Sequence, residues 1–541
     1  MTPRVKSLEK SLLIINLVAH GLSDTLMVHY KAGTFFILFL LLDLSIFAQV
    51  PPIKWQDNFG GSNDEIIARW CGPEPTQDGG YIFGGHTKSS DGDVTINKGG
   101  LDYWILKLDS LGAVEWQRTY GGSNKEKLRG VEQTDDGGFI IAGFSTSSDG
   151  DVSGNKGGKD YWILKLDPSG NIEWEQNYGG SNKDNPYSIE QTLDGGFVAA
   201  GISASSNGDV SSNNGGDDYW VLKLDPNGNI QWESSFGTSN SERAFSVDQT
   251  SDSGYAVGGW TDKSGNNDYW VLRLDKMGNL QWDKTFGGGG HDRMRSVRSL
   301  SDGGFFLLGS SRSSGGDVSD NYGSRDIWAV KLNSSGGIQW ESNYGGTSDD
   351  RGFSVDECSD GGYFVTGLSK SSDKDVGANK GSRDLWAFKL DSTGSIEWES
   401  NFGGTSGEHN GAGSEVADGE YVMACHTGSN DGDIDQNEGA RDLWIVRIGD
   451  TTRTSLRSTK TELSQLQPTP NPTSGKVRIE FGKKRRRVRA IVRDVTGRAL
   501  SHRTVKNTRR LGLDLKGKAG LYLIELRTEN GKREILKVMK E

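Results

Sequence analysis

The sequence predicts an all-β fold, of which the main part is a seven-bladed β-propeller. Three observations lead to this prediction: an Asp-x-Trp motif recurs seven times, each copy contains four short strand patterns, and the repeat region begins and ends with an incomplete copy. The steps between successive motif tryptophans are 58, 58, 50, 58, 58 and 58 residues. Such a period is typical of propellers and solenoids, whose units bury their apolar faces only against neighbouring units. The motif tryptophans are Trp104, Trp162, Trp220, Trp270, Trp328, Trp386 and Trp444.

The copy within residues 188–236 shows what the repeating unit is. Asp194-Gly195-Gly196 and Asn227-Gly228 separate its strand patterns, and such dipeptides form hairpin turns because those turns need positive φ. Four strands per unit is the composition of a propeller blade. The four patterns, named strands a to d in chain order, cover residues 188–192, 197–203, 218–225 and 229–236.

The two ends of the repeat region predict that the ring closes. Residues 53–59 form a d pattern with no strand a, b or c before it, and residues 442–449 form a c pattern with no strand d after it. We expect the N-terminal strand to complete the last blade, because an unpaired strand at either end would leave an open sheet edge. We therefore assign residues 50–450 to the propeller.

Loop lengths predict two unequal faces for the ring. The a-to-b turns, such as residues 136–138, and the c-to-d turns, such as residues 168–170, are minimal. The b-to-c loops, such as residues 147–159, and the d-to-a loops, such as residues 179–186, are long. In a four-stranded meander the two long classes leave from the same side, so one face carries most of the loops and, we expect, the function.

The N-terminal region, residues 1–48, is predicted to be a secretory signal. Residues 35–48 form an apolar run that follows Lys31 and ends in a small residue before Gln49, where we expect the mature protein to begin. Translation is expected to start at Met27, whose flanking residues form a basic n-region. A membrane anchor is the alternative, although the run is short and contains Asp43.

The C-terminal region, residues 468–541, is predicted to be a separate module joined by a Ser/Thr-rich linker, residues 451–467. From Thr451 onward the chain has 24 Lys and Arg against 8 Asp and Glu, a net charge of +16, so the preceding residues carry −28. Its Pro-Asn-Pro opening, its Asp494–Gly497 turn and its Gly-x-Tyr strand at Gly520 resemble the C-terminal sorting domain of proteins exported by type IX secretion. The resemblance implies a small β-sandwich that is recognised by the secretion machinery at the outer membrane and is usually cleaved off. The basic run Lys483–Arg487 departs from this pattern and is interpreted as a solvated hairpin tip, because it lies between two β patterns; a site for nucleic acid or an anionic surface is the alternative.

The repeats themselves resemble β-propeller repeats of many uncharacterised bacterial surface proteins, through the SV-x-QT-x-DGG and DYW-x-LKLD phrases. The resemblance implies a fold and a secreted or outer-membrane surface location, but no ligand. The charge of −28 argues against nucleic acid or anionic lipid as a partner. We therefore predict a non-catalytic binding or adhesion module, with a glycan or a protein as ligand. The alternative is an extracellular polysaccharide hydrolase or lyase.

Two acidic series recur in all seven copies, which favours a role in the fold. One series lies two residues before each motif tryptophan, as Asp102 and Asp160 do. A carboxylate that accepts backbone N–H bonds from a neighbouring loop would hold each blade together. The alternative for the second series is a ring of acids at the channel mouth that attracts cations. This second series, at the start of strand a, contains Glu65, Glu126, Asp184, Glu242, Asp292, Asp350 and Glu408.

The b-to-c loops contain a pattern that is similar to a calcium-binding loop. Alternating oxygen-bearing side chains are followed by a carboxylate at the twelfth position, which is the spacing of a Ca²⁺ loop, although the bidentate Glu and the flanking helices are absent. Asx-turns are the alternative, because Asp-Gly and Asn are common in turns. No other cofactor is predicted. The candidate calcium ligands are Asp91, Asp93, Asp149, Asp151, Asn155, Asp160, Asp373, Asp375, Asp431, Asp433 and Asp435.

Two further groups of residues break the repeat and are candidate ligand-binding residues. His86 and His426 occupy the end of strand b in the blades that ring closure makes neighbours, and Glu408-His409 lies on the loop that leads into the last blade. They could form a metal or acid–base site. Trp260 ends strand b of the fourth copy, whose b-to-c loop is eight residues shorter than the others, and could stack on a sugar ring. Isolated surface histidines and a buried tryptophan are the alternatives.

Overall fold

The computed structural model describes the propeller and most of the C-terminal region. The predicted signal, residues 1–48, and the predicted linker, residues 451–467, lie outside the described residues. Among the described residues, no helix has the length and apolarity that crossing a membrane requires. The described residues are 49–68, 72–263, 265–434, 437, 439–449, 468–469, 473–493, 499–516, 518–528 and 533–541.

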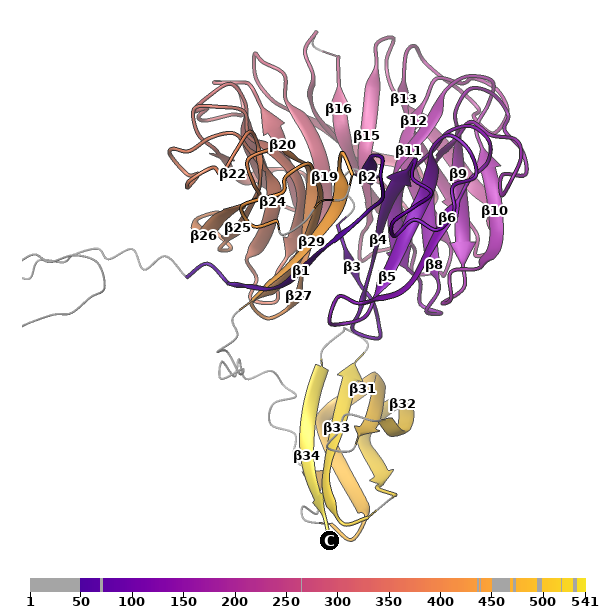
Figure 1. Cartoon of the computed structure of the whole chain (residues 1–541), viewed down its shortest axis with the longest axis vertical. Coiled ribbons are helices and arrows are strands. Elements are labelled where there is room, and N and C mark those ends of the chain that lie inside the picture. The colour runs from indigo at the N-terminus through magenta and orange to yellow at the C-terminus, as the bar shows by residue number, and fades with distance from the viewer. Residues whose placement is uncertain are drawn as a thin grey trace, which may run out of the picture. The chain divides into compact units, whose positions relative to one another are not determined.

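Seven antiparallel sheets form the blades of the propeller, and consecutive blades pack side by side around a ring (Figure 1). Strand a of each blade is innermost and strand d is outermost. Blade 1 contains β2 (Glu65–Ile67), β3 (Glu74–Pro75), β4 (Tyr81–Thr87), β5 (Asp102–Leu108) and β6 (Val114–Tyr120). Blade 2 contains β7 (Glu126–Gln133), β8 (Phe139–Ser145), β9 (Asp160–Leu166) and β10 (Ile172–Tyr178). Blade 3 contains β11 (Asp184–Gln191), β12 (Phe197–Ser203), β13 (Asp218–Leu224) and β14 (Ile230–Phe236).

The remaining blades repeat the same order of strands. Blade 4 contains β15 (Glu242–Gln249), β16 (Tyr255–Thr261), β17 (Asp268–Leu274) and β18 (Leu280–Phe286). Blade 5 contains β19 (Arg293–Ser299), β20 (Phe305–Ser311), β21 (Asp326–Leu332) and β22 (Ile338–Tyr344). Blade 6 contains β23 (Arg351–Glu357), β24 (Tyr363–Ser369), β25 (Asp384–Leu390) and β26 (Ile396–Phe402). Blade 7 contains β27 (Glu408–Ala417), β28 (Glu420–Thr427), β29 (Asp442–Gly449) and β1 (Ile53–Phe59).

The N-terminal strand closes the ring as the sequence predicts. Strand β1 pairs antiparallel with β29, with Phe59 opposite Leu443 (Figure 1). The indole N–H of Trp444 donates to Gln56 Oε1 over 3.0 Å. Phe59 is 4% exposed and packs in a core that combines blade 7 residues such as Ile445 with blade 1 residues. The two ends of the repeat region are therefore joined both by a strand ladder and by a shared apolar core.

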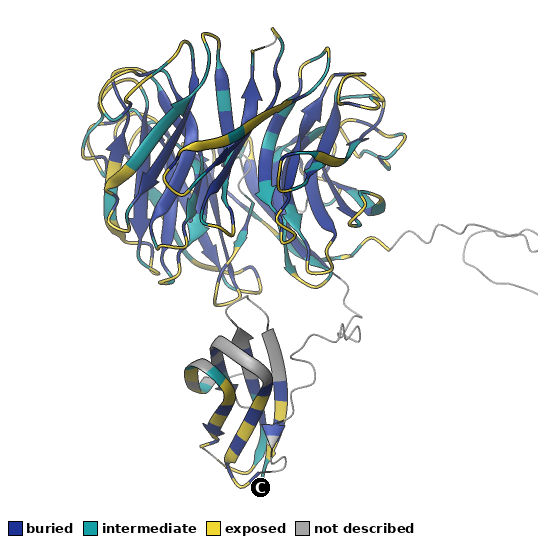
Figure 2. Cartoon of the chain, turned by 180° about the vertical axis from the view of Figure 1, so that it is seen from behind, coloured by how far each residue is buried: buried dark blue, intermediate teal, exposed yellow. Residues whose placement is uncertain are grey.

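Apolar packing between blades explains why strand c is the most regular part of the repeat. The middle strands are almost entirely buried, whereas the loops and the outer strands are partly exposed (Figure 2). Tyr103 of blade 1 packs on Trp162 of blade 2, with ring centroids 4.8 Å apart, and its hydroxyl donates to the Trp162 carbonyl over 3.2 Å. The same pair recurs as Tyr161 with Trp220. Each motif tryptophan thus fills the space between its own blade and the preceding one.

The C-terminal region forms a second all-β unit. It contains β30 (Pro468–Thr469), β31 (Lys476–Arg493), β32 (Ala499–Asp514), β33 (Gly520–Thr528) and β34 (Arg533–Lys540). The strands belong to one antiparallel sheet, in the order β30-β31-β33-β34, with β32 paired to β31. Alternate side chains of these long strands, such as Ile479, Ile524 and Val538, are fully buried in one apolar core. The run Lys483–Arg487 lies within β31, so it is strand and not the hairpin tip expected from the sequence.

Candidate functional site

The acids at the start of strand a are buried and hold the blades together. Glu126 Oε2 accepts the backbone N–H of Gly122 over 2.9 Å, and its Oε1 accepts the Ser145 hydroxyl over 2.8 Å. All seven members of this series are 0% exposed, so they cannot form the exposed ring that would attract cations. The cation-attracting alternative is therefore wrong, because these carboxylates face the Ser or Thr at the end of strand b instead of the channel mouth.

The aspartates before the motif tryptophans lie next to the first series. Asp102 Oδ2 accepts the backbone N–H of Lys98. Burial raises the pKa of Asp102 to about 6, although this hydrogen bond opposes the rise. The loop glycine Gly121 lies between the two carboxylates, because a Cβ at this position would come within 2.2 Å of Asp102 Oδ1. The double-carboxylate arrangement thus requires the glycine that follows strand d.

The candidate calcium loops use their carboxylates in the same way. Asp149 Oδ1 accepts the backbone N–H of Ser123 over 2.8 Å, and Asp151 Oδ2 accepts that of Gly121 over 3.0 Å. Asn155 donates to the Ser145 carbonyl over 3.0 Å. Asp91, Asp93, Asp373, Asp375, Asp431 and Asp433 accept equivalent bonds.

Calcium binding by these loops stays a prediction. Within the described residues, no group of three or more His, Cys, Asp or Glu side chains lies close enough to hold a metal ion. Asp160 is fully buried and accepts the Lys156 backbone N–H, so it lies beneath the loop. Asp435 lies outside the described residues.

The pairing of β27 with β28 in blade 7 brings part of the histidine group together. His409 and His426 face each other across β27 and β28, and their rings stack with centroids 5.1 Å apart. Burial, followed by the nearby Arg383 guanidinium, lowers the pKa of His409 to about 4. Glu408 is fully buried, and burial raises its pKa to about 7. His86 is 3% exposed at the equivalent position of blade 1.

Trp260 lies under arginine side chains. It is 8% exposed and shares an apolar cluster with Tyr187, Ile202 and Phe245. The guanidinium groups of Arg243 and Arg293 lie 5.5 and 5.7 Å from its ring centroid. These cation–π contacts occupy the indole surface that a sugar ring would need. The structure therefore places Trp260 as a support for two arginines, and stacking on a sugar would require both arginines to move.

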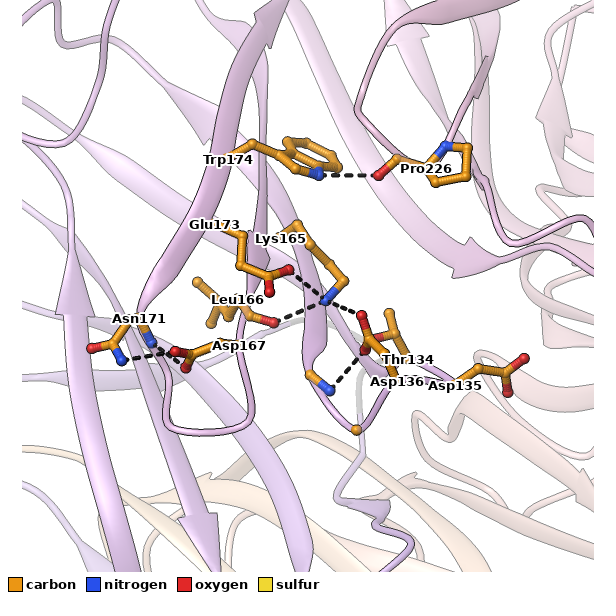
Figure 3. Close-up of polar contacts among 12 residues, drawn as sticks. Thr134, Asp135, Asp136, Lys165, Leu166, Asp167, Asn171, Glu173, Trp174 and Pro226 are labelled. Atoms are coloured by element: carbon orange, nitrogen blue, oxygen red, sulfur yellow. Dashed lines mark hydrogen bonds and ion pairs between the residues drawn. The ribbon is translucent and has the colours of Figure 1, made fainter. Parts of the chain in front are cut away.

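On the face with the short turns, buried lysines form ion pairs with carboxylates of the same blade. Lys165 is buried on β9, donates to the Leu166 carbonyl over 3.0 Å, and pairs with Asp136 and Glu173 over 2.9 and 3.0 Å (Figure 3). The same lysine recurs at Lys223 and Lys389. Its charge neutralises the carboxylate of the a-to-b turn, so these groups stabilise the hairpins and leave little charge for a ligand.

The lining of the inner part of the channel includes three glutamates and three arginines. Glu74, Glu132, Glu190 and Arg298 line a cavity of about 190 Å³. Burial, followed by repulsion from Glu74, raises the pKa of Glu132 to about 8. Burial disfavours the charged form of Arg298, but the carboxylates of Asp248 and its neighbours outweigh it and raise the pKa of Arg298. The Glu190 carboxylate accepts the Gln249 backbone N–H, which joins strand a of blade 3 to that of blade 4.

The loop-face mouth of the channel is basic, in contrast to the net charge of the ring. A pocket of about 430 Å³ opens there between blades 5 and 6. Arg295 and Phe353 line both this pocket and the cavity of about 190 Å³, so the two adjoin. We call it the arginine pocket. Its lining residues are His291, Arg293, Arg295, Ser310, Arg312, Arg325, Arg351, Phe353 and Asn410.

The sequence analysis did not predict the arginine pocket, although the sequence contains an excess of arginine in one blade. Four positions recur in every blade and carry arginine in blade 5. Two of them follow the strand-a acid by one and by three residues, and hold Arg293 and Arg295. The third comes directly after strand b and the fourth directly before strand c; they hold Arg312 and Arg325. Blade 5 alone has arginine at all four positions; blade 3, by comparison, has Asn185, Tyr187, Ala204 and Asp217. Comparing these positions blade by blade would have found the cluster.

Comparisons with known proteins identify the C-terminal region. Residues 469–541 match the family of the secretion system C-terminal sorting domain, so the chain is exported by type IX secretion to a secreted or cell-surface location. No curated protein matches the sequence.

Solved structures that resemble the chain have low sequence identity to it. A protein of unknown function from Dyadobacter fermentans is 12% identical, with a TM-score of 0.38, and covers 74% of this chain and 99% of its own. An ACO protein of Synechocystis is 10% identical, with a TM-score of 0.36, and covers 67% and 96%. A β-fructofuranosidase of Bombyx mori is 10% identical, with a TM-score of 0.26, and covers 66% and 86%. At these values the likenesses say nothing about ligand or activity.

Proposed function

We propose that the protein is an exported, non-catalytic binding module whose propeller binds its ligand at the loop-face mouth of the central channel. The sorting domain supplies the location, and the repeat supplies a rigid scaffold. The short-turn face is occupied by internal ion pairs such as Lys165 with Asp136. The loop face therefore carries the positions that are free to vary between blades.

The observation that carries this proposal is the arginine pocket. Residues that maintain the fold recur in every blade, as the strand-a acids do. Residues that depart from the repeat in one sector need a different explanation. Blade 5 has four arginines at mouth-facing positions, and they meet Arg351 of blade 6 in one concave site. A concave site with a few convergent polar groups is the usual form of a ligand site.

A hydrolase or lyase on this scaffold has no specific observation in its favour. A glycosidase would need two carboxyl groups on opposite sides of the bound sugar. Asp349 pairs with two arginines of the pocket, with Arg325 over 3.6 Å and with Arg351 over 2.6 Å. Asp349 is thus engaged in orienting two arginines, and we propose binding without catalysis.

Capture of ligands by the exported protein tests the proposal. The protein purified from the producing cells would be screened against neutral and acidic glycans and against cell-envelope fractions. We expect at least one class to be captured, and we expect Arg312→Gln to reduce this capture. Arg118→Gln is the matched control, because Arg118 is exposed on β6 and donates to the Gln117 carbonyl, away from the pocket. Capture that Arg312→Gln and Arg118→Gln affect equally would contradict a site at the channel mouth.

A further inference from the structure

We infer that the arginine pocket recognises an oxyanion group, the carboxylate, sulfate ester or phosphate of an extracellular ligand. This inference rests on the proposed function and names the chemistry of the same site. Five guanidinium groups line the pocket, and Asp349 is the carboxylate that pairs with two of them. Guanidinium presents planar N–H donors that match the geometry of a carboxylate, sulfate or phosphate group.

The pocket has an excess of positive charge that the protein does not neutralise. Arg325 and Arg351 share Asp349. No carboxylate of the described residues forms an ion pair with Arg293 or Arg312. The Arg293 Nε–H donates to the neutral Asn267 side chain over 2.9 Å. Arg293 is partly buried, and partly buried charges normally have partners of opposite sign, so a bound anion would complete this site.

The pKa values show that the arginines repel one another. Burial lowers the pKa of Arg325 to about 10; Asp349 opposes this, and Arg351, Arg312 and Arg293 add to it. Burial also lowers the pKa of Arg293, and Arg312, Arg243 and Arg351 add to that effect. An anion at the centre of the group would relieve this mutual repulsion.

Neighbouring contacts hold the guanidinium groups in place. Arg293 lies against the Trp260 ring, and the Arg295 guanidinium lies 4.5 Å from the Phe245 ring centroid. Phe353 is 7% exposed and forms an apolar wall of the pocket. Asn410 adopts a left-handed conformation with φ of 56° and adds an amide to the lining. Oriented donors beside apolar walls favour a single group that is partly withdrawn from water.

The remaining charge of the ring limits the kind of ligand. Residues before Thr451 carry a net charge of −28. The net negative charge of the ring would repel a densely charged anionic polymer overall. A ligand with one oxyanion group, or with widely spaced ones, would gain the local attraction without the wider repulsion.

Thermal shift measurements on the exported full-length protein test the inference. Sulfate, phosphate and glucuronate would be titrated at constant ionic strength against chloride. We expect at least one of them to raise the Tm, because an anion that binds the folded state stabilises it. Arg312 is exposed, so Arg312→Gln should fold normally, and we expect it to weaken the apparent affinity more than tenfold.

One control variant and the pattern of anion responses decide the result. Arg118→Gln should respond to the anions as the wild type does. A response to glucuronate alone, to sulfate alone or to phosphate alone identifies the source of the oxyanion and supports the inference in each case. Equal anion responses in Arg312→Gln and the wild type, or no response at all, would overturn it. Mouth-dependent capture of an uncharged glycan would also overturn it while leaving the proposed function intact.

Discussion

Replacement of Phe59 by alanine tests whether the N-terminal strand closes the ring. Phe59 is 4% exposed, and its ring centroid lies 6.0 Å from that of Phe83 in a core shared by blades 7 and 1. Truncation of a buried phenylalanine to alanine costs about 3–5 kcal/mol, through lost burial and the cavity left behind. For a ring of about 400 residues the entropy of unfolding is roughly 0.8 kcal/mol per degree, so the Tm should fall by about 4–6 °C.

The matched control is Phe286→Ala. Phe286 ends strand d of blade 4, is 7% exposed and packs in the core between blades 4 and 5. In a closed ring the two substitutions should lower the Tm by similar amounts in differential scanning calorimetry. In an open array Phe59 would lie on a fraying terminal strand, and its loss would cost less than about 1 kcal/mol. A Tm unchanged by Phe59→Ala but lowered by Phe286→Ala would therefore refute closure.

Three further predictions concern export, the candidate calcium loops and pH. Val538 lies in the core of the C-terminal unit, so Val538→Asp should leave the protein in the periplasm, as should deletion of residues 521–541. Lys537 is exposed, so Lys537→Asp should not affect export. Cell fractionation that finds both variants at the surface would contradict this prediction. Asp151→Ala should lower the free energy of unfolding by about 1–3 kcal/mol both in EDTA and in millimolar Ca²⁺, because its backbone bond to Gly121 is lost; a loss seen only with Ca²⁺ would assign the loops to the metal. Burial raises the pKa of Asp160 to about 6 and that of Asp326 to about 7, whereas the value in the unfolded chain is 3.8. The contribution of these two groups to the free energy of unfolding is therefore complete below about pH 4 and is lost as the pH rises through 6 to 7. The Tm should accordingly be higher at pH 5 than at pH 8, with a smaller difference in Asp326→Asn; a Tm that rises over this range would show that these pKa values are not raised.

The fold could be predicted because each blade repeats the same strand order and the same packing residues. The motif tryptophans mark the space between blades, and the incomplete copies at 53–59 and 442–449 predict the pairing of β1 with β29. The seven-fold recurrence of the strand-a acids indicated a structural role, which their complete burial confirms. The repeat does not indicate in which direction these side chains point. The sequence alone therefore could not exclude an exposed ring of acids.

The site was harder to predict because its residues are far apart in the sequence. Trp260 was a candidate because it is an aromatic residue beside a short loop. The sequence does not show which side chains lie over its ring, and in the folded protein these are Arg243 and Arg293. The arginine pocket combines residues from 291 to 410, and only the ring geometry brings them together. A position-by-position comparison of the blades would have found the excess of arginine, but not the concave shape.

The most direct test of a ligand site at the channel mouth is a crystal structure of the exported protein with an oligosaccharide that carries the oxyanion group, uronate, sulfate ester or phosphate, that raises its Tm. We predict that this group binds within hydrogen-bond distance of Arg312 and Arg325 in the arginine pocket. Ordered sugar elsewhere on the ring with the arginine pocket empty, or no bound sugar at a concentration that saturates capture, would contradict the account.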